Sequence, residues 1–275
     1  MSGYTEALFT LLAINCVVAL SGYMSLAAGQ LNLGIAGFMA IGAYVSAFLT
    51  NNYDLPIFLG IIAGGAAACL IALLLAVPVL RTHGIYLALA TFALGQVIQG
   101  ILLNMEVVGA AAGYGVSKHA SFSFIAGTAL IVIAVIFYLS KTRFSMYLTA
   151  VKSDAIVSDL FGVNVRVTMV QAFSLGGLLA GIGGALYGHY YNYLEPQNFN
   201  ILLSIYIALY VLLGGVQTFY GPLVGAAVFT LLPELLRDSD QWRFVVFAIA
   251  VILVMAVRPQ GLITSDLLRR FGGRA

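Results

Sequence analysis

Nine apolar runs joined by short turns make up most of this chain, and they leave it few ways to fold. A helix needs about 20 residues to cross the hydrocarbon core of a bilayer, and most of the runs approach or exceed that length. Hydrophobic residues form 62% of the chain and charged residues only 8%, too little charge to cover a water-soluble protein of 275 residues. The runs lie at residues 7–28, 31–50, 56–80, 84–104, 122–139, 168–190, 201–213, 223–236 and 244–257.

The sequence therefore predicts an all-α protein, a polytopic transmembrane helical bundle with about eight or nine spans in a single domain over residues 1–275. Residues 1–10 carry no Lys or Arg before the first apolar run, and no small-residue cleavage pattern follows. We expect a retained first span rather than a signal peptide. Cys16 and Cys69 both lie within apolar runs, where we expect them to pack rather than to form a disulfide.

A loop over residues 141–167 is the main polar interruption, and it contains Lys141, Arg143, Lys152 and Arg166. If this loop faces the cytoplasm, alternation of the spans puts every Lys and Arg on that side except Lys118, Arg237 and Arg243. This distribution agrees with the excess of basic residues in cytoplasmic loops. Strict counting of nine spans then places the N-terminus outside.

Within this loop, residues 153–162 are predicted to form a short amphipathic helix. Ser153 or Asp154 can accept hydrogen bonds from the free amides of the first turn, and Gly162 is placed to end the helix. Apolar side chains share one face and polar side chains the other. The pattern fits a docking element for a partner protein, and it equally fits an ordinary surface helix. The candidate docking residues are Lys152, Ser153, Asp154, Ile156, Val157, Leu160, Phe161 and Gly162.

Two glycine-rich stretches interrupt the apolar pattern, one between Gly22 and Gly42 and one over residues 212–222. Each is either a broken or re-entrant segment lining a pathway or a tight cytoplasmic turn, and the turn is slightly favoured for the second stretch. Gln96 and Gln99 lie three residues apart on one helix face, so they either line a path or form hydrogen bonds with neighbouring helices. The hydrogen-bonding interpretation is favoured. The candidate path residues are Gln30, Asn32, Tyr86, Gln96 and Gln217.

A third glycine-rich run, residues 176–188, holds small residues four apart within one predicted span. Such spacing lets two helix backbones approach closely in a membrane. The candidate packing residues are Gly177, Gly181, Gly184 and Gly188.

No residue group favours an enzyme. His83, His119 and His189 lack metal-ligand spacing, and no phosphate-binding loop motif occurs. We therefore expect no metal and no cofactor in this chain, and any nucleotide dependence must come from a partner. Apart from Glu234 near the end of its run, no ionisable residue lies near the centre of a predicted span, which disfavours an ion-coupled carrier. A net charge of +2 is too small to indicate nucleic-acid binding.

Six regions occur in a specific order and spacing along the chain. They are LGIAGFMAIGAY at 33–44, GIYLALATFAL at 84–94, the loop from AVKSD at 150–154 to FGVN at 161–164, AGIGGALY at 180–187, LGGVQTFYGPLVGA at 213–226 followed by LPELLR at 232–237, and RPQGL at 258–262. Together they resemble the permease subunits of ABC importers for branched-chain amino acids, specifically the second of the two permeases. The resemblance covers nearly the whole chain.

This resemblance implies that residues 152–164 form a coupling helix seated in a groove of a cytoplasmic ATPase. It implies a second, homologous permease subunit, two ATPase subunits carrying ATP and Mg, and a periplasmic solute-binding protein, all assembled at a bacterial inner membrane that this chain crosses several times. One departure concerns residues 108–115, where VGAAAGYG replaces the family's Thr-Gly-Gly followed by a small residue and Gly. Relatives also carry urea, short amides and aromatic carboxylates, so the cargo stays open.

We therefore expect a permease subunit of an ATP-driven importer, which forms with a second permease the path for a small polar solute such as a branched-chain amino acid. The alternative is a self-sufficient secondary transporter or channel. An intramembrane enzyme ranks third because the chain lacks a plausible pairing of nucleophile and base.

Overall fold

A computed structural model describes residues 3–235 and, beyond them, residues 248–249, 251–252, 256, 258 and 261–263. In this part of the chain almost all regular structure is helical. The α-helices are α1 (Gly3–Ala27), α2 (Ile35–Asn52), α3 (Ile57–Val79), α4 (Ile85–Asn104), α5 (Phe122–Ser140), α6 (Arg143–Ser153), α7 (Ala155–Leu160), α8 (Val165–Tyr191), α9 (Ile201–Gly214) and α10 (Tyr220–Leu235). Short 3-10 turns lie at Glu106–Val108, Ala110–Ala112 and Pro196–Asn198, and the strands β1 (Tyr114–Gly115) and β2 (Tyr193–Leu194) pair antiparallel.

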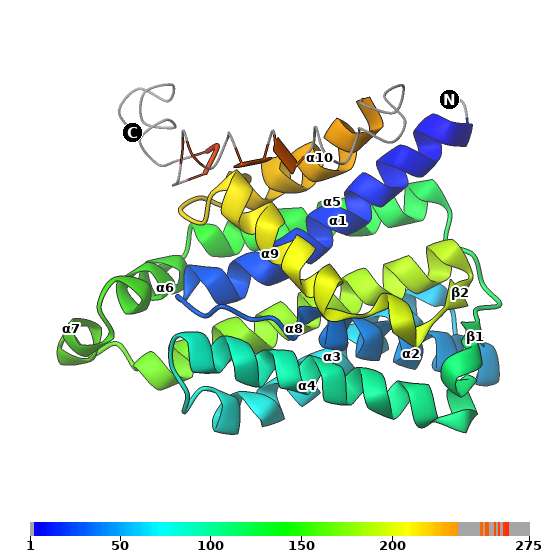
Figure 1. Ribbon diagram of the computed structural model, residues 1–275, viewed down its shortest axis with the longest axis horizontal. Helices are drawn as coiled ribbons and strands as arrows, with labels where there is room; N and C mark the ends of the chain where they lie inside the picture. The colour runs from blue at the N-terminus through cyan, green and yellow to red at the C-terminus, as the bar shows by residue number, and fades with distance from the viewer. Residues whose placement is uncertain are drawn as a thin grey trace.

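The long helices run roughly along the long axis of the molecule, which gives it two distinct ends (Figure 1). Helices α6 and α7 form one end, here called the α7 end. Strands β1 and β2 lie at the opposite end, here called the β end. Helix α1 starts near the β end and runs toward the α7 end, so the N-terminus and the α6–α7 loop lie at opposite ends, as the counting of spans predicted.

Eight of the nine predicted apolar runs are helices, and the predicted all-α class is confirmed. Among the described residues, six helical segments are long and apolar enough to cross a membrane: α1, α3, α4, α5, α8 and the segment Pro196–Gly214 that includes α9. Helices α2 and α10 are shorter. Most of the ninth run, residues 244–257, lies outside the described residues.

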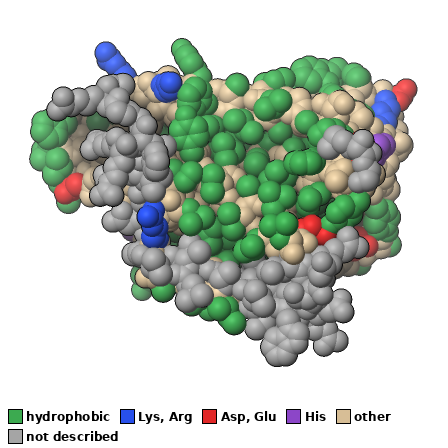
Figure 2. Space-filling view, turned by 90° about the horizontal axis from the view of Figure 1, so that it is seen from above, with side chains coloured by type: hydrophobic (Ala, Val, Ile, Leu, Met, Phe, Trp, Pro, Cys, Tyr) green, Lys and Arg blue, Asp and Glu red, His purple; other side chains and the backbone are tan. Residues whose placement is uncertain are grey.

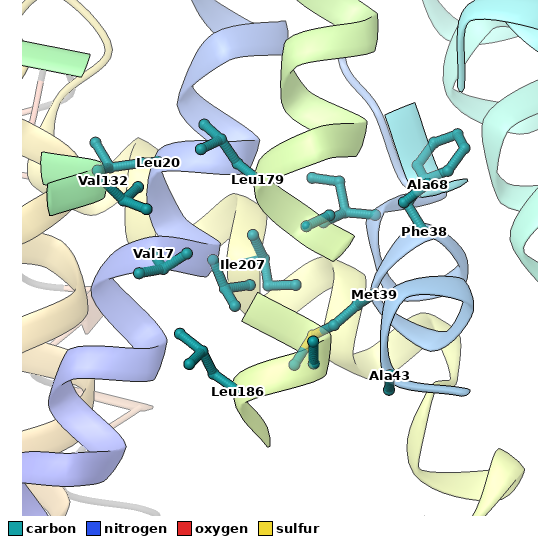
Figure 3. Close-up of a cluster of buried hydrophobic side chains, with 14 of the residues drawn as sticks. Val17, Leu20, Phe38, Met39, Ala43, Ala68, Val132, Leu179, Leu186 and Ile207 are labelled. Atoms are coloured by element: carbon teal, nitrogen blue, oxygen red, sulfur yellow. The ribbon is translucent and has the colours of Figure 1, made fainter. Parts of the chain in front are cut away.

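Helix α8 occupies the centre of the bundle. Figure 3 shows its Leu179 and Leu186 between side chains of α1, such as Val17, and side chains of α2, such as Met39. The ring of Phe173 on α8 meets the ring of Phe38 on α2 edge-on, with centroids 5.5 Å apart. Helices α4 and α5 lie nearer the outside and keep many apolar side chains exposed. Such faces suit lipid or another membrane subunit.

The four candidate packing glycines all lie on α8 against other elements. A Cβ atom at Gly177 would come within 2.4 Å of Ala72 on α3, and one at Gly181 within 2.6 Å of Ala68 on the same helix. Gly184 lies against α2, while Gly188 faces Leu194 of β2 at a looser 3.1 Å. The missing side chains thus let α8 contact α2 and α3 at backbone distance.

Side-chain hydrogen bonds and an ion pair connect the elements at the β end. The ring of His189 on α8 bonds the Ser46 hydroxyl on α2 through Nε2 at 2.9 Å, and its Nδ1 bonds the carbonyl of Lys118 at 2.9 Å. Because a carbonyl only accepts, Nδ1 carries a proton, and in the neutral ring Nε2 accepts from the hydroxyl. The Lys118 ammonium contacts the Asp54 carboxylate at 2.6 Å. His189 therefore has a structural role in this arrangement.

Candidate functional site

Helix α7 has the start and end signals that the sequence indicated. The Asp154 carboxylate accepts hydrogen bonds from the amides of Ile156 and Val157 at 2.9 and 3.0 Å, which makes it the N-cap. Gly162 follows the helix at φ +81°, a conformation that favours glycine, and the amide of Val163 donates to the Ser158 carbonyl. Local chemistry at both ends fixes this short helix.

The apolar side chains of α7 are largely uncovered by the rest of the described chain. Ile156, Leu160 and Phe161 are 77%, 83% and 84% exposed, and Val157 is also exposed. Ser158, predicted on the polar face, is buried, and its hydroxyl donates to the Asp154 carbonyl. Helix α7 therefore presents a small apolar surface at one end of the molecule with no covering element among the described residues.

Lys152 and Ser153 belong to a different helix from the one predicted. They are the last residues of α6, an amphipathic helix within the predicted loop, and Asp154 separates α6 from α7. The Lys152 side chain lies over Gly29: a Cβ atom added to this glycine would be 3.5 Å from Cγ of the lysine. Burial there lowers the pKa of Lys152. Helix α6 therefore connects α7 to the end of α1.

The break between α1 and α2 is confined to residues 28–34, because α1 continues helically through Gly22 as far as Ala27. The broken backbone is held by other helices. The amide of Leu33 donates to the Thr91 hydroxyl on α4 at 3.0 Å, and the Gln30 side-chain amide donates to the Met169 carbonyl on α8 at 3.0 Å. Thr91 and Met169 lie about two turns and one turn inside their helices, so the segment enters the bundle.

Gln30 and Asn32 are almost fully enclosed, at 1% and 2% exposure. Asn32 caps its own turn through a 2.8 Å bond from the Gly34 amide to its carbonyl oxygen. The other polar atom of each side chain, Oε1 of Gln30 and Nδ2 of Asn32, has no hydrogen-bond partner within the described structure. A buried polar atom without a partner costs free energy, so this segment holds an acceptor and a donor that are free for another molecule or another state.

The remaining path candidates are not brought to this segment. Tyr86 is exposed at the start of α4, and Gln96 is half-buried further along the same helix. Gln217 lies in the turn between α9 and α10 and lines a cavity of about 480 Å³ at the α7 end, together with Tyr23 and Lys152. Gln99 donates to the Pro196 carbonyl at 3.0 Å, which is the helix-bonding role favoured from sequence.

Sequence reasoning missed two hydroxyl groups that hold the break. Thr91 accepts from Leu33, and Ser204 on α9 accepts from the amide of Ala36 at 3.0 Å. No sequence signal marks them, because Ser and Thr in apolar helices usually bond the carbonyl of their own preceding turn.

Charge divides between the two ends of the bundle. In the described part of the chain, Lys118 is the basic residue of the β end, and the others lie at the α7 end: Arg81, Lys141, Arg143, Lys152, Arg166 and Arg258. Figure 2 shows hydrophobic side chains over the broad middle of one face, with charged side chains mostly toward the ends. Residues 3–235 contain no cluster of His, Cys, Asp or Glu fit to hold a metal ion.

Comparison with known proteins agrees with this geometry. Residues 4–256 match the family described as the permease component of branched-chain amino acid transport systems. The chain is 27% identical to the high-affinity branched-chain amino acid transport system permease protein LivM of Escherichia coli, covering 92% of this chain and 66% of the relative. It is also 27% identical to LivM of Salmonella typhimurium, covering 96% of this chain and 69% of the relative.

A more distant relative has a different cargo in its name. The fructose import permease protein FrcC of Rhizobium meliloti is 24% identical, over 94% of this chain and 79% of that protein. No solved structure is similar enough to match. The chain spans about two thirds of the length of the two LivM proteins.

Proposed function

The chain belongs to the family of branched-chain amino acid transport permeases, and on this basis we propose that it forms, with a second permease subunit, the membrane path of an ATP-driven importer. Two ATPase subunits on the cytoplasmic side and a periplasmic solute-binding protein complete the proposed assembly. The cargo is a small polar solute, with branched-chain amino acids first among the candidates because both LivM relatives carry that name. The protein would reside in a bacterial inner membrane.

The observation that carries the proposal is the exposed surface of α7. Three large apolar side chains, Ile156, Leu160 and Phe161, face outward from a helix whose two ends are capped. Exposing them to water is unfavourable, whereas inserting them into an apolar groove of a partner would remove that cost. A short, rigid helix between α6 and α8 can also pass a displacement of the partner to the long central helix.

Sidedness follows from charge. We assign the α7 end to the cytoplasm because it carries the Lys and Arg residues of the described chain other than Lys118. The N-terminus then lies outside. Counting α2 and α10 with the six longer segments gives eight membrane helices, since α2 would be about 27 Å long at 1.5 Å per residue, close to the thickness of the hydrocarbon core.

For the path we propose the segment between α1 and α2. Gln30 and Asn32 supply an unpartnered acceptor and an unpartnered donor inside the bundle. Neutral polar groups suit a path that must release the solute as readily as it takes it up. The second permease would supply the opposite wall.

Purification from the native membrane tests the assembly. The proposal expects two ATPases and a second permease to copurify, and solute uptake in proteoliposomes to require ATP together with the solute-binding protein. Uptake by the isolated chain, driven by an ion gradient alone, would instead establish the secondary transporter. Binding of a panel of small solutes to the solute-binding protein then identifies the cargo.

A further inference from the structure

A cavity of about 710 Å³ opens at the α7 end between two turns that are far apart in the sequence. One wall is the end of α3 and the turn that leads to α4. The other wall is α7 and the start of α8. Its lining includes Val77, Leu80, Arg81, Arg166 and Met169. A volume of this size can hold a small ligand or the headgroup region of a lipid.

The polar part of this cavity is basic. Arg81 and Arg166 both line it, with His83 beside them, and Asp159 is the one acidic side chain among the lining residues. Within residues 3–235, neither guanidinium group forms an ion pair. Two arginines that form no ion pair within the described residues supply, in one cavity, positive charge and forked N–H donors that suit the oxygens of a phosphate group.

The start of α8 adds positive potential at the same place. Asn164 caps this helix by accepting from the Val167 amide at 3.0 Å. Val165, the first residue of α8, lines the cavity together with Asn164. Because the N-terminus of a helix carries partial positive charge, α8 reinforces the attraction that the arginines exert on an anion.

The apolar part of the cavity extends into helices that are long enough to cross the membrane. Val77 lies in α3 and Met169 in α8, each about one turn from the polar boundary. Apolar side chains at that depth suit an acyl chain better than the polar surface of a cytoplasmic protein. Basic pockets between membrane helices at the boundary are typical headgroup sites of anionic lipids.

We propose that this cavity binds an anionic phospholipid, with its phosphate between Arg81 and Arg166 and an acyl chain along Val77 and Met169. This lipid site rests on the proposed function in one respect: the orientation proposed above assigns the site to the cytoplasmic leaflet. Since Ile156 and Leu160 of α7 also line the cavity, the lipid contacts the helix that we assign to ATPase docking. The composition of the membrane would then affect how α7 is held.

Native mass spectrometry of the purified transporter tests the site directly. The protein is placed in nanodiscs of phosphatidylcholine with a minor share of phosphatidylglycerol, released, and scored for retained phosphatidylglycerol. We expect wild type to retain it, and the double variant Arg81→Gln, Arg166→Gln to retain about tenfold less, because each lost charge-assisted bond to phosphate weakens binding substantially. Arg143→Gln is the matched control, since Arg143 lies at the same end outside the cavity lining.

A second variant separates lipid binding from misfolding and from simple charge effects. Val77→Trp fills the membrane-level part of the cavity and leaves both arginines in place, so retention should again fall while thermal stability in detergent stays near wild type. Equal retention in the double variant and in Arg143→Gln overturns the proposal. So does a double variant that keeps its lipid but loses its ATPase subunits, because the cavity would then belong to the protein interface.

Discussion

A Cβ atom placed on Gly184 of α8 would lie 1.9 Å from the carbonyl oxygen of Met39 on α2. Real Cβ atoms do not approach an oxygen so closely, and the oxygen belongs to the backbone, which cannot rotate away. The two helices therefore pack at a distance that only glycine permits at this position.

The first prediction follows from this contact. Gly184→Ala should destabilise the protein by about 1–3 kcal/mol, because α2 and α8 must separate to admit the methyl group. The measurement is the unfolding midpoint in detergent together with the yield from the membrane. Gly127→Ala is the control: Gly127 lies in α5 with nothing within 4 Å of the Cβ position, so this change should be neutral or slightly stabilising. Equal midpoints for the two variants would contradict the close packing.

The second prediction concerns docking through α7. Leu160→Asp should weaken ATPase binding by about 2 kcal/mol or more, because it places a charge where an apolar anchor is expected. Leu160 is 83% exposed in this chain, so thermal stability of the isolated subunit should not change. Copurification of the ATPases and solute-stimulated ATP hydrolysis provide the readouts. Val107→Asp, at an exposed apolar residue of the 3-10 turn Glu106–Val108, is the control that should leave both intact.

The third prediction concerns the Asp154 cap. Asp154→Ala removes the acceptor of the Ile156 and Val157 amides and should cost α7 about 1 kcal/mol. Hydrogen exchange at those two amides should become about fivefold faster, since 1 kcal/mol corresponds to that factor. Asp154→Asn keeps the acceptor and should restore slow exchange. If both variants exchange like wild type, the cap does not hold the helix.

The fourth prediction concerns the path. In a background without Cys16 and Cys69, single cysteines at positions 30, 86, 96 and 217 should differ in their reaction with a small water-soluble thiol reagent. Position 217 should react first because Gln217 is exposed and lines a cavity, whereas position 30 should stay protected in the resting state. Trapping ATP on the partner should increase the rate at position 30. If the cysteines at all four positions fail to react with the reagent in every state, the path lies elsewhere.

The fifth prediction concerns the Asp54–Lys118 pair at the β end. The hydrogen bond from Lys118 and its positive charge lower the pKa of Asp54 below its ordinary value. Because the pKa of Asp54 is lower in the folded protein than in the unfolded chain, the pair stabilises the folded state at any pH above the unfolded-state pKa of about 3.9. This stabilisation is lost as the pH falls through the folded-state pKa. Lys118→Met should return the pKa to about 3.9 in an NMR titration of the Asp54 carboxyl. Lys141→Met, at the opposite end, should leave it unchanged.

Local signals account for much of this structure. The apolar runs predicted eight of the helices to within a few residues, since a helix satisfies its backbone internally wherever side chains suit lipid or protein. The start and end of α7 were also predictable, because Asp154 and Gly162 act within four residues of their own positions. Helix α6 was missed, because Arg143–Ser153 has no side-chain cap bond and is too polar on average to form an apolar run.

The sequence by itself determined a membrane protein of apolar helices, its capped loop helix and the division of charge between its ends. Only the tertiary structure decided which helices lie at the centre: among the six candidate spans of the described residues, α5 is one of the most apolar and the least buried, while glycine-rich α8 is the most buried. In a bilayer, lipid and protein both accept apolar side chains, so hydropathy does not distinguish them. The break at residues 28–34 was likewise undecided until Thr91 and Met169, remote in the sequence, supplied the bonding groups that hold its backbone inside the bundle.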